Sequence, residues 1–91
     1  FENYKPTAAT VVSGTAVYNP PSLANAAQIS TTVNITGALA GDILACSFSA
    51  PLQGVRMWAE MAQAQIATVY FRNDTGQAVD LPSGTIRVKV V

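Results

Sequence analysis

The chain of 91 residues is long enough for one domain with one hydrophobic core and too short for two. Apolar residues make up 49% of it and charged residues only 11%, against roughly 25% in an ordinary soluble domain, so we expect part of its surface to face other protein. Five positive and five negative residues leave no net charge and no basic cluster, which argues against nucleic acid as a partner, and the longest apolar run, residues 43–46, is too short to cross a bilayer.

The predicted elements are strands, because apolar and polar residues alternate with a period of two in segment after segment. The first strand is expected at residues 10–18, which are rich in Val and Thr. The clearest alternation runs through residues 28–36, and shorter alternating runs follow at residues 44–49 and 55–61. In the last of these runs the pattern places Trp58 on the outward face, between Arg56 and Glu60.

The two C-terminal strands differ in character. Residues 66–72 are apolar on both faces, which is typical of a central strand or of a strand in an interface. Residues 85–90 alternate regularly, with Ile86, Val88 and Val90 predicted to face inward.

Turn-forming residues separate these strands at close spacing, which predicts an all-β fold: a single antiparallel β-sandwich, or a small Greek-key or jelly-roll-like barrel, of six to seven short strands. Gly, Pro, Asn and Asp gather at residues 19–22, 37–42, 50–54, 73–76 and 81–84. A helical turn competes at residues 59–67, whose composition is compatible with a helix. We favour strand, turn and strand there because the flanking residues alternate.

The N-terminal segment differs from the rest. Residues 1–7 are mixed polar and aromatic and predict an arm that is ordered only on a neighbouring molecule. The expected division is therefore an arm with the start of the first strand in residues 1–16 and the β domain in residues 17–91.

Asp74, Thr75 and Gly76 spell the triplet of aspartic proteases, in which two such aspartates from two subunits activate a water molecule. The residues before the triplet are Arg72 and Asn73, where those enzymes have an apolar strand end, and no matching apolar segment with glycine follows. The alternative, which we prefer, is a polar hairpin turn in which Asp74 bonds its own backbone.

No other residue set predicts catalysis, a metal or a cofactor. The chain has no histidine and one cysteine, so nucleophile-base pairs and zinc clusters are not expected. Cys46 alternates with Leu44 and Phe48, which predicts a buried, unreactive side chain.

Trp58 is the leading candidate for an interaction, because an outward Trp next to Arg is typical of the centre of protein interfaces. The alternative is a Trp covered by a loop of its own subunit, and the sequence leaves both open. The full set of predicted interface residues is Phe1, Tyr4, Arg56, Trp58, Glu60 and Tyr70.

Several segments resemble a β domain of bacteriophage and prophage virion proteins. They read YNPPSLA at residues 18–24, TTVNITGA at 31–38, GD at 41–42, FSAPLQG at 48–54, NDTG at 73–76 and DLPSGTIRV at 80–88. The resemblance covers roughly residues 17–91 and implies a structural or attachment role in a symmetric oligomer, with no catalytic residue. This chain departs from the pattern at Arg56, Trp58 and Glu60, where smaller Thr or Ser residues are typical.

Two functions follow as expectations. The first is a capsid decoration or head-fibre-type protein, with a trimer favoured, that lies on the capsid surface and binds the major capsid protein. The second is a tail-fibre or tail-spike module in which Trp58 or Tyr70 contacts the host surface. In both, the partners are other copies of the chain and other virion proteins.

Overall fold

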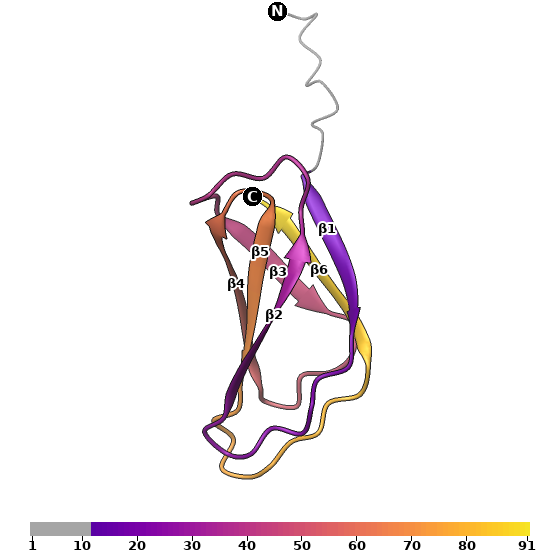
Figure 1. Cartoon of the computed structure of the whole chain (residues 1–91). Coiled ribbons are helices and arrows are strands. Elements are labelled where there is room, and N and C mark those ends of the chain that lie inside the picture. Colours follow the sequence, from indigo (N-terminus) through magenta and orange to yellow (C-terminus); the bar gives the residue numbers. More distant parts are fainter. Residues whose placement is uncertain (1–11) are drawn as a thin grey trace, which may run out of the picture.

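The computed structural model describes residues 12–91, which form six antiparallel strands in two sheets of three. One sheet has the order β1-β6-β3 and the other β2-β5-β4, and the two lie face to face as the layers of a sandwich (Figure 1). The strands are β1 (Ser13–Tyr18), β2 (Gln28–Asn34), β3 (Leu44–Phe48), β4 (Arg56–Gln63), β5 (Ile66–Arg72) and β6 (Gly84–Val90). The prediction of a small all-β sandwich is confirmed.

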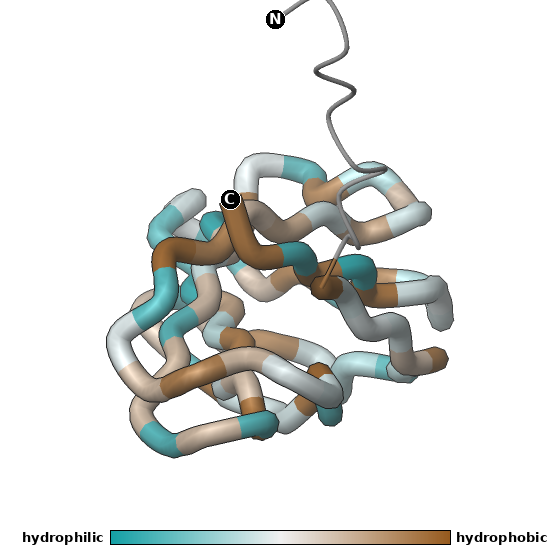
Figure 2. Tube along the Cα trace, turned by 90° about the horizontal axis from the view of Figure 1, so that it is seen from above, coloured by the Kyte–Doolittle hydropathy of each residue, from teal (hydrophilic) through white to brown (hydrophobic). Residues whose placement is uncertain are grey.

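The observed strands follow the predicted alternation closely. In β6, Ile86 and Val88 are buried while Arg87 and Lys89 are exposed, as the period of two requires. Figure 2, seen from the end of the molecule where the C terminus lies, shows hydrophobic and hydrophilic residues succeeding each other along the chain. β1 begins at Ser13, and residues 10 and 11 of its predicted range lie outside the described residues.

Residues 59–67, whose composition is also compatible with a helix, lie in a β-hairpin. β4 and β5 pair directly, with an irregularity in register between Glu60 and Gln63. Gln65 makes the turn between them with a φ of +65°. β5 is the middle strand of its sheet, buried on one face and half-buried on the other, which confirms the prediction of a central strand at residues 66–72.

The core lies between the sheets and is centred on aromatic rings. Phe71 of β5 is fully buried, and its ring centroid is 5.7 Å from that of Tyr18 on β1 and 5.6 Å from that of Phe48 on β3. Branched side chains of both sheets surround these rings, among them Val33, Val69, Ile86 and Val88. Each sheet thus buries one face on the core and leaves the other exposed.

Candidate functional site

The outer face of the β2-β5-β4 sheet brings together four of the six predicted interface residues. Trp58 of β4 lies directly opposite Tyr70 of β5, and Glu60 lies opposite Thr68. Arg56 stands at the start of β4 on the same face. Paired residues of neighbouring strands point to the same side of a sheet, so these side chains form one continuous surface. Phe1 and Tyr4 lie outside the described residues.

Trp58 and Tyr70 form a stack of two nearly parallel rings. Their ring centroids are 5.3 Å apart and the ring planes meet at 18°, which is an offset-stacked arrangement. Trp58 retains 37% of its exposure, so one side of the indole faces outward while Tyr70 of the neighbouring strand lies against it. Trp58 therefore faces outward, as the alternation predicts, and its stacking partner is Tyr70.

A short hydrogen bond holds the stack in place. The hydroxyl of Tyr70 donates to Oε1 of Glu60 at 2.6 Å. The pKa of the Tyr70 hydroxyl is raised above its ordinary value, chiefly because the hydroxyl donates to Glu60, with smaller effects of desolvation and of the negative charge of Glu60. The phenol therefore remains a protonated donor at neutral pH.

Next to the stack lies a cluster of ion pairs that the sequence pattern did not predict. Nε of Arg72 lies 3.0 Å from both carboxylate oxygens of Asp74, and Nη2 of Arg56 lies 3.5 Å from Oδ2. The signal in the sequence is the position of Arg72, two residues after Tyr70 and hence on the same face of β5. These groups are largely exposed, so the pairs contribute little to stability and mainly hold the guanidinium groups in position.

The preferred alternative for Asp74 was wrong in its detail. The Asp74 carboxylate binds the side chains of Arg72 on β5 and Arg56 on β4. Asp74 itself lies in the loop from β5 to β6, which joins the two sheets and is not a hairpin turn. An aspartic protease dyad needs a second carboxylate beside the first. Within the described residues, the groups that pair with Asp74 are the guanidinium groups of Arg72 and Arg56.

The neighbouring Asn73 carries out the backbone bonding that was assigned to Asp74. Its side-chain amide is fully buried and donates to the carbonyl oxygens of Leu23, Ala24 and Gln77 at 2.9, 3.3 and 2.7 Å. Its Oδ1 accepts from the backbone N–H and the hydroxyl of Thr75 at 3.0 and 2.7 Å. Asn73 is thus a structural residue that fixes the loop after β5 to the loop before β2.

Cys46 packs against the core and is partly buried, where the sequence predicted a buried side chain. Burial raises the pKa of its thiol, which lowers the fraction of reactive thiolate at neutral pH. Among residues 12–91 no group of three metal-binding side chains comes together, and no helix of the described part is long and apolar enough to cross a membrane.

Protein-family models, curated proteins and solved structures contain no match to this chain. The surface that the residues themselves identify is therefore the outer face of the β2-β5-β4 sheet: an exposed aromatic stack, a bonded carboxylate and two guanidinium groups held by Asp74. Groups of this kind suit binding by ring contact and hydrogen bonding.

Proposed function

We propose that this chain is a structural domain of a bacteriophage particle, and that it binds other protein of the particle through the outer face of the β2-β5-β4 sheet. The observation that carries the binding surface is the Trp58–Tyr70 stack. The assignment to a phage particle rests on the sequence resemblance. The favoured form is a trimeric decoration or head-fibre-type protein on the capsid surface, in contact with the major capsid protein.

The stack is suited to a protein contact because it is already ordered before a partner arrives. Both rings are fixed on adjacent strands, and the Tyr70 hydroxyl is bonded to Glu60. Binding then loses little side-chain freedom, while the exposed side of the indole offers a large apolar area for burial. Arg56 and Arg72 beside it supply hydrogen-bond donors of the type enriched at interfaces.

A second candidate is a tail-fibre or tail-spike module in which the same stack binds a glycan of the host surface. The observation that favours it is the polar row beside the rings, since Ser30 lies directly opposite Tyr70 and both Gln28 and Thr32 are exposed on the same face. Flat rings pack on the C–H face of a sugar, and neighbouring polar groups bond its hydroxyls.

Three measurements test the proposal and separate its two forms. The mass of the purified full chain in solution gives its oligomeric state, and sedimentation with emptied capsids measures binding to the head. Phages carrying Trp58→Ala are then compared with phages carrying Ser30→Ala, a matched change on the same face.

For the head form we expect oligomers, capsid binding, and particles that Trp58→Ala makes less stable while adsorption is intact. The tail form predicts the reverse: lost adsorption with normal assembly. A stable monomer that binds no capsid and a Trp58→Ala phage that assembles and adsorbs normally would overturn both.

A further inference from the structure

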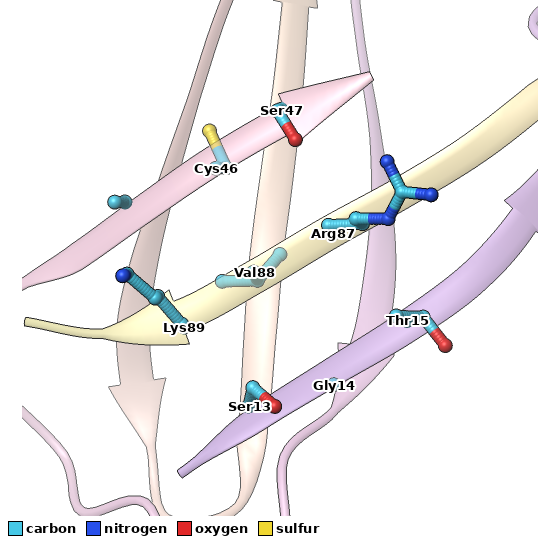
Figure 3. Close-up of a pocket in the computed structure, with 9 residues that line it drawn as sticks. Ser13, Gly14, Thr15, Cys46, Ser47, Arg87, Val88 and Lys89 are labelled. Atoms are coloured by element: carbon cyan, nitrogen blue, oxygen red, sulfur yellow. The ribbon is translucent and has the colours of Figure 1, made fainter. Parts of the chain in front are cut away.

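The outer face of the other sheet, β1-β6-β3, carries a hollow of about 350 Å³. No residue of the other sheet lines it, and the side chains of Arg87 and Lys89 in its lining are exposed, so it lies on the outer face. Figure 3 looks onto it and shows the side chains of Arg87 and Lys89 on β6, with β3 on one side and β1 on the other. The lining residues are Ser13, Gly14, Thr15, Ala45, Cys46, Ser47, Arg87, Val88 and Lys89.

The register of the strands explains the hollow, which we call the cationic groove. Lys89 is flanked directly by Ser13 and Ala45, and the row of Arg87 is completed by Thr15 and Ser47. Each long cationic side chain on the middle strand therefore stands between two short ones on the outer strands. The space that larger neighbours would fill remains open, and three hydroxyl groups line it.

Within residues 12–91, the cations of the two outer faces differ in their ion pairing. Arg56 and Arg72 share the carboxylate of Asp74, whereas no ion pair within residues 12–91 involves Arg87 or Lys89. The lining of the groove contains no acidic residue. The two cations are two positions apart on one strand, about 6.7 Å along its axis, and repel each other, so an anion between them is favoured.

We propose that the cationic groove binds an acidic saccharide, with Arg87 and Lys89 on its carboxylates and Ser13, Thr15 and Ser47 on its hydroxyls. A volume of about 350 Å³ is at the small end of ligand sites, which suits one or two sugar rings. The groove has no aromatic ring on which a base could stack, and two cations are few for a phosphate backbone, so nucleic acid fits less well. This site lies on the opposite side of the sandwich from the stack and does not depend on the proposed function.

The test is a calorimetric titration of the full chain with trigalacturonic acid, with neutral maltotriose as the matched sugar. We expect binding of the acidic sugar and none of the neutral one. Arg87→Gln and Lys89→Gln should each weaken binding about tenfold, because each removes a charge-assisted hydrogen bond. Ser47→Leu keeps both charges but fills the groove and should weaken binding as well. Arg56→Gln, on the other outer face, should leave it unchanged.

Circular dichroism and thermal unfolding of each variant establish that it is folded, which the exposed positions of Arg87 and Lys89 favour. No binding of trigalacturonic acid by the folded wild-type chain would overturn the proposal. Equal weakening by Arg56→Gln, or full affinity in Ser47→Leu, would show attraction by charge alone and would also overturn it. Tighter binding of a single-stranded oligonucleotide, lost in the same variants, would replace the saccharide with nucleic acid.

Discussion

Tyr70 shows how a single hydrogen bond controls the ionisation of a residue in the exposed stack. Its hydroxyl donates to Glu60, which raises its pKa, and its ring lies against Trp58, the one tryptophan of the chain. Because the folded pKa is raised, the bond stabilises the fold below the ordinary tyrosine pKa of about 10, and this contribution is lost as the pH rises through the folded pKa.

Glu60→Gln should therefore move the titration of Tyr70 to lower pH. Tyrosinate next to an indole quenches its emission, so the fluorescence of Trp58 measured against pH reports the ionisation of Tyr70. We expect the alkaline loss of emission to shift toward lower pH in Glu60→Gln and to disappear in Tyr70→Phe. An unchanged midpoint in Glu60→Gln would mean that the hydrogen bond does not govern this pKa.

Asn73 illustrates what residue patterns alone do not disclose. A turn of Asn, Asp, Thr and Gly is expected to contain a side chain that bonds the backbone, but which one turns inward depends on what lies beneath the loop. Here the carbonyls of Leu23 and Ala24, about fifty residues earlier in the chain, need donors, and Asn73 supplies them. Asp74 faces outward to the arginines of the adjacent strands.

Asn73→Ala should lower the free energy of unfolding by about 2 to 4 kcal/mol, because buried carbonyls lose their donors. Asp74→Ala removes only exposed ion pairs and should cost less than about 1 kcal/mol. Guanidinium denaturation of both variants measures the difference. If the two losses were equal, the buried network around Asn73 would not be what fixes the loop.

At the scale of the strands, alternation predicted position and facing well. It placed Trp58 outward and Ile86 and Val88 inward, as the structure confirms. For residues 66–72 it predicted a central strand or a strand in an interface, and the structure shows the central strand of a sheet. Alternation did not predict which strands pair, because a period of two specifies the face on which a side chain lies and not the neighbouring strand. β1 pairs with β6, which lies at the other end of the chain, and no local sequence pattern predicts this pairing.

Gly14 on β1 has no side chain, and the backbone of β2 lies so close that there is no room for one. A Cβ at this position would meet the backbone oxygen of Asn34, at the end of β2 in the other sheet. At Gly84, by contrast, the nearest atoms belong to the side chains of Ser49 and Phe48, which can move. The sequence alone does not distinguish the surroundings of these two glycines.

Gly14→Ala should therefore cost about 1 to 3 kcal/mol of stability, since the backbones of two strands must separate. Gly84→Ala, the matched control, should cost less. Thermal unfolding of the two variants provides the comparison, and a Gly14→Ala protein as stable as Gly84→Ala would show that β1 does not approach β2 as closely as described.

For the molecule as a whole, the sequence predicted the fold class and four residues that lie together on the outer face of the β2-β5-β4 sheet, but not the cationic groove. The groove combines three consecutive residues of each of β1, β3 and β6, segments that are far apart in the sequence and lie side by side only because of the strand order. Arg87 and Lys89 appear in the sequence as ordinary outward charges. They line a common groove because the register places short residues of β1 and β3 on both sides of them.

Phe71 packs the two sheets together, whereas Trp58 lies on an outer face. Comparing the two residues distinguishes a side chain that stabilises the fold from one that is available for binding. Phe71 contacts aromatic rings of both outer strands of the opposite sheet, so Phe71→Ala should cost about 3 to 5 kcal/mol, a large part of the roughly 5 to 15 kcal/mol that stabilises a small domain. Trp58→Ala removes an exposed stacking partner and should cost only about 1 to 2 kcal/mol. Guanidinium denaturation of both variants measures the two losses. Should Trp58→Ala prove as damaging as Phe71→Ala, the indole would be a residue of the fold, and its proposed role in contacting other proteins would lose its support.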